Sequence, residues 1–386
     1  MEWMRQALDE LAARGLVRSP PVLGPGDGEP PDGRTIVVEG RRYVSFASNN
    51  YLGLAGDARL RRAAADAAMR WGTGAGASRL IVGTLSVHRE LERRLAAFKG
   101  AEDAALFPTG YQAGMGGVTA LVGPGDAVIL DKLSHACLVD AARASRARVR
   151  VYPHLDMDRL AELLARESGT RRRLVVTDSL FSMDGDTAPL AEIAALAERH
   201  DTMVLVDEAH ATGTLGPGGR GLVAEAGVAS ARLVQMGTLS KALGSLGGFL
   251  AGTRDVCEYL RNTARAFVYT TALPAAAAAA ALAALDAIES DHSPVERLRA
   301  NVAHLAGKLP ALGVRTPIVP VIAGEADRAV EAQAALRERG LWVPAIRPPT
   351  VPRGRSRLRV SLTAAHTKAD MDLLAGALVE LGLAGE

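Results

Sequence analysis

The sequence predicts an α/β protein: a large domain with a mostly parallel sheet flanked by helices, then a smaller α+β domain. From about residue 49 onward, short apolar runs alternate with segments of helical spacing, which is typical of a sheet covered on both faces. The length of 386 residues is enough for one large and one smaller domain. We therefore expect an N-terminal arm over 1–48, a large domain over 49–288 and a small C-terminal domain over 289–386.

The arm begins with a predicted helix over residues 1–17. Met4, Leu8 and Leu11 follow the spacing of one helical face. A segment rich in proline and glycine follows over 19–33, and we expect it to lack regular structure.

The predicted strands are short apolar runs, most of them bounded by turn residues. Those of the large sheet are Ala104–Phe107, Ala127–Asp131, Val149–Tyr152, Leu174–Thr177, Val204–Asp207, Leu233–Met236 and Gly248–Ala251, and those of the small domain are Ile318–Ile322 and Leu358–Leu362. Helices are expected between them, for example over 114–121 and 190–199. The alanine-rich run 272–288 predicts a packed helix rather than a membrane span, because alanine forms helices well but is weakly apolar.

Charge and cysteine content argue against several classes of protein. A formal net charge of +2 offers no electrostatic basis for binding nucleic acid or an acidic membrane. Two distant cysteines, Cys137 and Cys257, argue against a disulfide framework and a cysteine-rich metal site, and we expect no metal. The first five residues lack the layout of a signal peptide, so we expect a cytoplasmic protein.

Chemically active side chains follow the predicted strands at their carboxyl ends. Asp207 ends one strand, and Lys241 follows the next strand along the chain. Gly110 and Tyr111 stand where another strand turns into a helix, whose free amides bind anions. Ligands of open α/β sheets bind at this edge. An acid, a lysine and an anion cradle are what pyridoxal phosphate requires, so the sequence predicts this cofactor.

Two other motifs suggest different functions. Residues 207–210 read Asp-Glu-Ala-His, as in nucleic-acid helicases, but those ATPases also need a G-x-x-x-x-G-K-[ST] loop, which the sequence lacks. The glycine cluster over 72–78 suggests a dinucleotide site, but it follows a helical pattern rather than a strand, and its third glycine is missing.

Five strings in one order then become recognisable: SNNYLGL at 48–54, DKLSHA at 131–136, FSMDGD at 181–186, VDEAHATG at 206–213 and TLSK at 238–241. On these strings the chain resembles the α-oxoamine synthases, a branch of the fold type I pyridoxal-phosphate transferases. The likeness runs from about Phe46 to His366. Asn50 replaces a common aspartate and Ser240 a frequent glycine, and neither change affects a group that makes or breaks bonds.

The C-terminal strings at 345–352 and 357–366 most resemble the members that condense L-alanine with a pimeloyl thioester in biotin biosynthesis. This resemblance implies a decarboxylative, Claisen-type condensation that releases carbon dioxide and a free thiol. A sibling activity is the alternative, such as that of 2-amino-3-ketobutyrate CoA ligase, which joins glycine to acetyl-CoA. Whether coenzyme A or an acyl carrier protein delivers the acyl group stays open.

The resemblance also implies roles around the cofactor ring. Lys241 would form a Schiff base with the cofactor and then act as general base at the substrate Cα. Asp207 would pair with the pyridinium nitrogen, His210 would meet the phenolic oxygen, and His135 would stack on the ring. Ser182 would hydrogen-bond near the same oxygen. Lys241, His210 and His135 are thus the expected catalytic residues.

For the cofactor phosphate, the resemblance implies the amides of Gly110 and Tyr111 and the hydroxyl of Thr238. Thr270 and Thr271 correspond to a contribution from the neighbouring subunit, which implies a homodimer with shared active sites.

Three further residues are expected to bind substrate. By the resemblance, Arg359 would hold the amino acid's carboxylate, which suits the forked guanidinium. Asn49 would assist it there. Arg18 would meet the far carboxylate of the pimeloyl chain.

Overall fold

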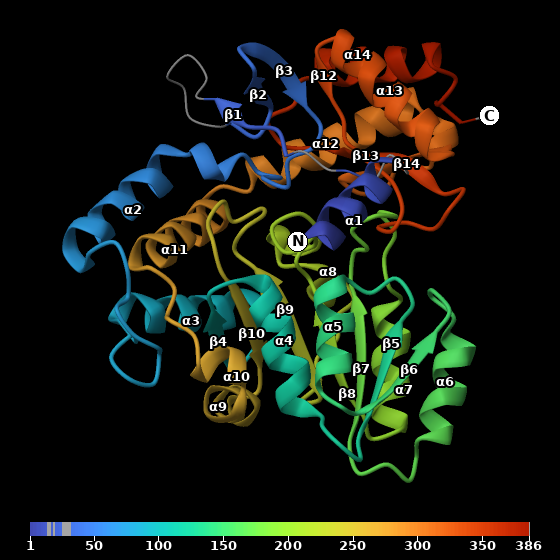
Figure 1. Ribbon diagram of the computed structural model, residues 1–386. Helices are drawn as coiled ribbons and strands as arrows, with labels where there is room; N and C mark the ends of the chain where they lie inside the picture. The colour runs from blue at the N-terminus through green and yellow to red at the C-terminus, as the bar shows by residue number, and fades with distance from the viewer. Residues whose placement is uncertain (14–16, 18–19, 25–31, 386) are drawn as a thin grey trace.

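The computed structural model describes residues 1–13, 17, 20–24 and 32–385, and it forms two lobes joined by long helices (Figure 1). One lobe contains a seven-stranded sheet in the order β4-β10-β9-β8-β7-β5-β6. Its strands are β4 (Asp103–Phe107), β5 (Ala127–Asp131), β6 (Arg148–Tyr152), β7 (Arg173–Asp178), β8 (Met203–Asp207), β9 (Leu233–Thr238) and β10 (Gly248–Gly252). Every predicted strand of the large sheet is therefore confirmed.

The sheet is parallel except at β10, which runs antiparallel to both of its neighbours. Its helices are α2 (Ala58–Trp71), α3 (Ser86–Lys99), α4 (Gly110–Leu121), α5 (Ala136–Ala144), α6 (Met157–Arg166), α7 (Leu190–Arg199), α8 (Leu222–Glu225), α9 (Arg254–Thr263), α10 (Arg265–Val268) and α11 (Ala275–Ser290). The last of these confirms that the alanine-rich run is a packed helix.

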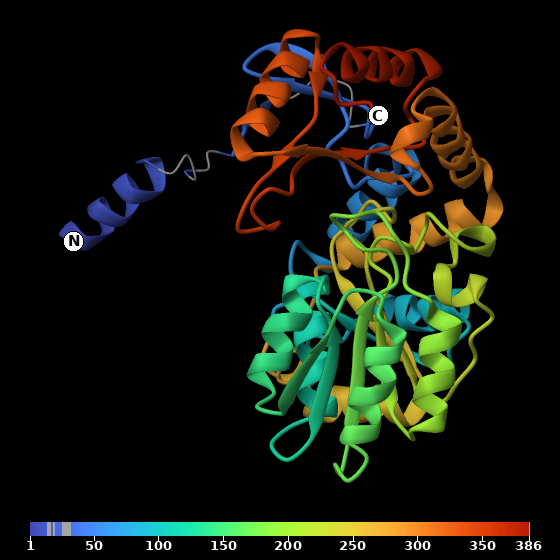
Figure 2. The ribbon, with the colours of Figure 1, turned by 90° about the vertical axis from the view of Figure 1, so that its right-hand side faces the viewer.

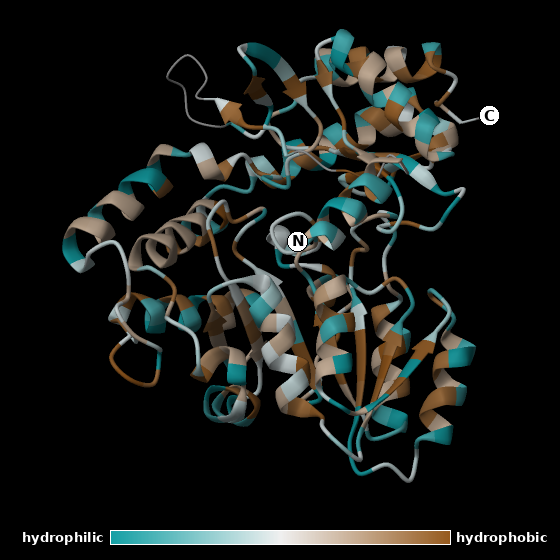
Figure 3. Cartoon of the chain, viewed as in Figure 1, coloured by the Kyte–Doolittle hydropathy of each residue, from teal (hydrophilic) through white to brown (hydrophobic). Residues whose placement is uncertain are grey.

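Alternate residues of each central strand face opposite layers, because successive side chains of a strand point to opposite sides. In β7, Val176 packs in a cluster with α4, α5, α9 and α10, whereas Val175 packs in a second cluster with α6, α7 and α8. Both valines are fully buried, which is worth about 1.5–3 kcal/mol for each side chain. Figure 3 shows the apolar strands of the sheet between helices that carry polar residues on their outer faces.

The second lobe combines the arm with the C-terminal region. Its sheets have the orders β1-β2-β3-β12 and β11-β14-β13. The elements are β1 (Leu23–Gly24), β2 (Thr35–Val38), β3 (Arg41–Ser45), α12 (Ser293–Lys308), β11 (Ile318–Gly324), α13 (Ala326–Glu338), β12 (Leu341–Trp342), β13 (Ala345–Ile346), β14 (Ser356–Ser361) and α14 (Lys368–Glu380).

The arm contains more structure than expected. The expectation that 19–33 lacks regular structure is wrong at Leu23 and Gly24, which pair with the edge of β2 as a two-residue strand. A hairpin joins β2 and β3, and both residues of its turn, Glu39 and Gly40, have positive φ, as a tight hairpin turn requires. Because β3 also pairs with β12, the arm is tied to the C-terminal lobe. The boundaries at 48/49 and 288/289 remain our proposal, and α11 crosses the second one.

The first helix, α1 (Glu2–Ala13), projects away from both lobes (Figure 2), and none of its residues is buried. Among the described ranges, no helix is long and apolar enough to cross a membrane. The cytoplasmic location stays a prediction.

Candidate active site

Lys241 lies in a tight turn that follows β9 at the carboxyl edge of the large sheet. The turn is closed by hydrogen bonds from Gly244 N to Lys241 O (3.0 Å) and from Ser245 N to Leu239 O (2.9 Å). Gly244 has a φ of +59°, and a Cβ there would lie 2.5 Å from Ala55 N. The turn therefore requires glycine at this position in order to present the lysine.

Lys241 is hydrogen-bonded to His210, which is hydrogen-bonded in turn to Tyr51. Its Nζ lies 3.0 Å from His210 Nε2, and the opposite ring nitrogen, Nδ1, lies 2.7 Å from the Tyr51 hydroxyl. Burial lowers the pKa of Lys241. Burial also lowers the pKa of His210 far below its usual value, and the positive charge of Arg359 acts in the same direction. The lysine is thus biased toward the neutral amine, which is the form that acts as a nucleophile or base.

Asp207 ends β8 and is buried beside the lysine. Its carboxylate accepts a hydrogen bond from Ala209 N (2.8 Å), and no described cation lies within ion-pair distance. Burial raises the pKa of Asp207, whereas the positive charge of Lys241 opposes this rise. A buried carboxylate without a bound cation is costly, so the position suits a protonated ring nitrogen of a ligand.

His135 stands immediately before α5, where its side chain accepts a hydrogen bond from Cys137 N. Its backbone N–H donates to Asp178 Oδ1 (3.0 Å), which fixes the loop. Ligand atoms of His135, Cys137 and Asp207 lie within 4.8 Å of one another, close enough for a metal ion. However, burial raises the pKa of the Cys137 thiol, which disfavours the thiolate that a metal would need.

The predicted anion cradle lies at the start of α4. The Thr109 side chain caps this helix by accepting a hydrogen bond from Gln112 N (3.1 Å). The amides of Gly110 and Tyr111 belong to the first turn, where no carbonyl of the same helix can accept from them. A Cβ on Gly110 would lie 3.1 Å from Thr238 Cβ, so the hydroxyl-bearing threonine lies directly beside the helix start. This arrangement fits a phosphate.

Within the one chain described, Thr270 contacts the same helix, whereas Thr271 lies against the loop before α3. Thr270 Oγ1 accepts a hydrogen bond from Gln112 Nε2 (3.2 Å), and Thr271 forms an isolated bridge with Ser78. Their expected contribution to a neighbouring subunit's site stays a prediction.

Arg359, on β14, reaches from the small lobe toward the cofactor region. Its guanidinium donates to Ser182 O (2.5 Å), to Ser361 Oγ (2.8 Å) and, at 3.4 Å, to Asn49 Oδ1. It is 6% exposed, and within the described part of the chain no carboxylate pairs with it. A buried guanidinium that contacts only neutral groups is suited to an incoming carboxylate. Arg18 lies outside the described residues.

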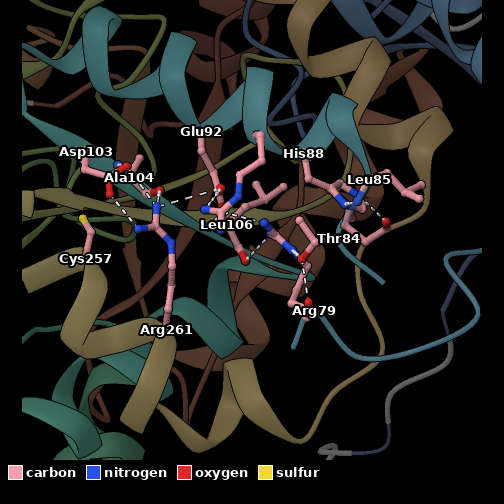
Figure 4. Close-up of polar contacts among 12 residues, drawn as sticks. Arg79, Thr84, Leu85, His88, Glu92, Asp103, Ala104, Leu106, Cys257 and Arg261 are labelled. Carbon is pink, nitrogen blue, oxygen red and sulfur yellow. Dashed lines mark hydrogen bonds and ion pairs between the residues drawn. The ribbon is translucent and has the colours of Figure 1, made fainter. Parts of the chain in front are cut away.

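A buried ionic network lies against β4, the strand that leads into the anion cradle at the start of α4 (Figure 4). Glu92, on α3, is 2% exposed and accepts from Arg79 Nη2 (2.9 Å) and from Leu106 N of β4 (3.1 Å). Arg261, on α9, forms a forked pair with Asp103 and also approaches Glu92 at 3.9 Å. The network therefore ties α3, β4 and α9 to the loop that begins at Arg79.

The structure brings together Lys241, His210, Asp207 and His135, and it places Asn49 and Ser182 against Arg359. Two further residues that lie at this site were not predicted from the sequence. Tyr51 lies inside the SNNYLGL string, but only its distance to His210 reveals a role. Asp178 ends β7 just as Asp207 ends β8, and this shared position is a signal that was present in the sequence.

The groups at these positions can be compared with the functional groups of pyridoxal phosphate. Among the described residues, no cation pairs with the buried Asp207 and no carboxylate pairs with the partly buried Lys241, and both lie at one site with a helix start that presents free amides. Pyridoxal phosphate has a basic ring nitrogen, an aldehyde and a phosphate, which meet these three groups respectively. The residues therefore fit the cofactor.

Comparison with known proteins identifies the family of the chain. Residues 41–378 match the family model described as aminotransferase class I and II. The chain is 51% identical to the 8-amino-7-oxononanoate synthase of Anaeromyxobacter dehalogenans, with 100% of this chain and 98% of the relative covered. It is 47% identical to the synthase of the same name from Nitrosomonas europaea, with 98% of each covered.

Solved structures share the fold. Serine palmitoyltransferase from Sphingomonas wittichii superimposes with a TM-score of 0.90 at 32% identity, covering 99% of this chain and 96% of that one. The 8-amino-7-oxononanoate synthase from Francisella tularensis gives a TM-score of 0.75 at 27% identity, covering 88% and 96%.

Proposed function

Because the chain belongs to the 8-amino-7-oxononanoate synthases, within aminotransferase class I and II, we propose that it condenses L-alanine with a pimeloyl thioester. The products are 8-amino-7-oxononanoate, carbon dioxide and a free thiol, in biotin biosynthesis. The chain is a pyridoxal-phosphate-dependent acyltransferase with the fold of the type I transferases. The observation that carries the proposal is a lysine amine held beside a histidine and a buried carboxylate, near an arginine that no carboxylate of the described residues pairs with.

When bound, pyridoxal phosphate supplies an electron sink for the pair released at the substrate Cα. Lys241 would hold the cofactor through its aldehyde, and Asp207 would keep the proton on the ring nitrogen. The amides of Gly110 and Tyr111, with the Thr238 hydroxyl, would hold the phosphate.

The chain's own residues then orient the substrate and move protons. Arg359, with Asn49 beside it, would hold the alanine carboxylate through its forked N–H groups. The Lys241 amine, whose pKa burial lowers, would remove the Cα proton and later return it. His210 Nε2 would donate a hydrogen bond to an oxygen near that amine.

The remaining roles are part of the same proposal. His135 would stack on the ring from the start of α5, and Ser182, whose carbonyl holds Arg359, would meet the phenolic oxygen. Thr270 and Thr271 would act on the phosphate of a partner subunit in a homodimer. Coenzyme A or an acyl carrier protein would deliver the pimeloyl group.

A product assay tests the reaction. The purified enzyme is incubated with alanine, glycine or serine, each with pimeloyl-, acetyl- or palmitoyl-CoA, and the products are identified by mass spectrometry. We expect 8-amino-7-oxononanoate from alanine and pimeloyl-CoA. A product from glycine and acetyl-CoA would instead indicate the ligase activity, and one from serine and palmitoyl-CoA would indicate the activity of the structural neighbours.

A further inference from the structure

Tyr51 lies against the far side of His210 from the reacting lysine. Tyr51 is 0% exposed and His210 is 6% exposed, and their rings meet edge to face at 6.0 Å. The Tyr51 hydroxyl lies 2.7 Å from His210 Nδ1, a short hydrogen bond. Thr214 Oγ1 donates to His210 O (2.6 Å), so the backbone of the histidine is held as well.

The direction of the hydrogen bond follows from its neighbours. The single hydroxyl proton of Tyr51 has two acceptors within reach, His210 Nδ1 at 2.7 Å and Asn49 Oδ1 at 3.3 Å. The Asn49 oxygen already faces two N–H groups of Arg359 at 3.4 Å. The shorter contact therefore receives the proton, and Nδ1 accepts it.

A neutral imidazole carries one N–H, so a ring that accepts at Nδ1 bears its proton on Nε2. Burial holds the pKa of His210 far below its usual value, and the nearby positive charge of Arg359 acts in the same direction. The ring is thus neutral, and its remaining N–H points at Lys241 Nζ, 3.0 Å away. An amine that accepts this hydrogen bond must be unprotonated, which is the state that removes a proton.

We propose that Tyr51 is a positioning residue, whose hydroxyl holds His210 in the Nε2–H tautomer. The Nε2–H of His210 then points at the Lys241 amine and, during turnover, at the oxygen atoms that take the place of that amine. Without the hydroxyl, the ring has no donor at Nδ1 and either tautomer can form. The Nδ1–H form would turn a lone pair toward the reacting oxygens, where a donor is required. The inference rests on the proposed function only for the identity of the substrates.

The first test requires neither cofactor nor substrate. Cofactor-free enzyme is labelled with ¹⁵N-histidine, and long-range ¹H–¹⁵N correlation spectra report the tautomer of each of the 8 histidines. The His210→Gln variant assigns the His210 signals. We expect the Nε2–H form in the unmodified enzyme and a mixed or Nδ1–H form in Tyr51→Phe. Tyr152→Phe, an equally buried tyrosine at the end of the outermost strand β6, serves as the matched control and should leave the His210 signals unchanged.

The second test is a double-mutant comparison with the substrates that the product assay identifies. Tyr51→Phe should lower kcat about tenfold, the effect of one lost hydrogen bond, with little change in KM for the amino acid. Adding Tyr51→Phe to His210→Gln should lower kcat no further, because the tyrosine acts through the histidine.

Each contrary outcome is distinct. Unchanged His210 shifts in Tyr51→Phe would overturn the proposal, as would multiplied kcat losses in the double variant. A rise in amino-acid KM at unchanged kcat would assign Tyr51 to the Asn49–Arg359 contact instead. If the product assay shows other substrates, the proposed function fails, while the nitrogen shifts still decide the role of Tyr51.

Discussion

Arg357 and Arg359 lie on the same face of β14 and reach the same loop, but within the described ranges only Arg357 is paired with a carboxylate. Arg357 Nη1 lies 2.6 Å from Asp184 Oδ1 and 2.9 Å from Met183 O. Arg359 contacts the carbonyl of Ser182 and the neutral side chains of Ser361 and Asn49. The first arginine therefore fastens the loop, while the second keeps its charge for a ligand.

Replacing Arg359 tests this division. Arg359→Ala should lower kcat/KM for alanine by about 10²- to 10⁴-fold, because two charged hydrogen bonds are worth about 1.5–3 kcal/mol each. The KM for the thioester should change little. Steady-state kinetics with each substrate varied in turn measure both effects, and a larger loss for the thioester would move the carboxylate site elsewhere.

Lys241→Ala removes the amine that bonds the cofactor. Borohydride reduction should link pyridoxal phosphate covalently to the unmodified enzyme but not to the variant, as intact-protein mass spectrometry would show. Lys132→Ala, a change of an exposed lysine immediately after β5, serves as the control and should still be labelled. An equal mass shift in Lys241→Ala would contradict the assignment.

Asp207→Asn keeps the shape of the side chain but removes its charge. The variant should still bind pyridoxal phosphate, while kcat falls by about 10³-fold, because a close ion pair at an effective dielectric of about 20 is worth roughly 4 kcal/mol. Absorbance titration measures cofactor binding separately from turnover. A variant with unimpaired kcat would contradict the role of Asp207 at the ring nitrogen.

Lys99 and Glu208 form a fully buried ion pair that holds the loop after β8. Their charged atoms lie 2.5 Å apart, and Lys99 Nζ also donates to Arg220 O (2.6 Å). Lys99→Met should lower the free energy of unfolding by about 3–5 kcal/mol, because it leaves the Glu208 charge buried and unpaired. The exposed pair of Lys308 with Asp372 offers a matched control, and Lys308→Met should cost about 1 kcal/mol or less in urea unfolding.

The double variant Lys99→Met/Glu208→Gln tests whether the buried charge of Glu208 causes the loss of stability. It should recover part of the lost stability, since no buried charge remains. A double variant less stable than Lys99→Met would indicate that the charge of Glu208 is not the source of the loss.

His154 bridges two carboxylates, and this bridge should make the free energy of unfolding depend on pH in the alkaline range. Its nitrogens lie 2.9 Å from Asp131 Oδ1 and 2.8 Å from Asp186 Oδ2. Burial opposes its charge, but the two carboxylates outweigh this effect and raise the pKa of His154 to about 10. The folded pKa exceeds the unfolded value of about 6.5, so the contribution is complete below about pH 6.5 and is lost as the pH rises toward 10.

Urea unfolding between pH 6 and pH 10 checks this prediction. His154→Gln should remove the part of the pH dependence that the unmodified enzyme shows over this interval. Parallel curves for the two proteins would contradict the bridge.

Local patterns along the chain were enough to predict the large sheet, because buried strands read as apolar runs and every one of them was found at its expected place. Lys241 and Asp207 could be predicted for a related reason: both follow such runs, and parallel strands bring their carboxyl ends to one edge. The hairpin of β2 and β3 was missed although Glu39-Gly40 marks its turn, because its strands are short and their partner β12 lies about 300 residues away in the chain.

Contacts between distant segments could not be obtained from local patterns. The sequence separates Tyr51 from His210 by 159 residues and Arg359 from Asn49 by 310, and no periodicity links positions so far apart. The same holds for charge: the lowered pKa of His210 and the hydrogen bonds of Arg359 to neutral groups depend on which groups surround these side chains after folding. Burial and pairing set these states, and both arise only when the two lobes pack together.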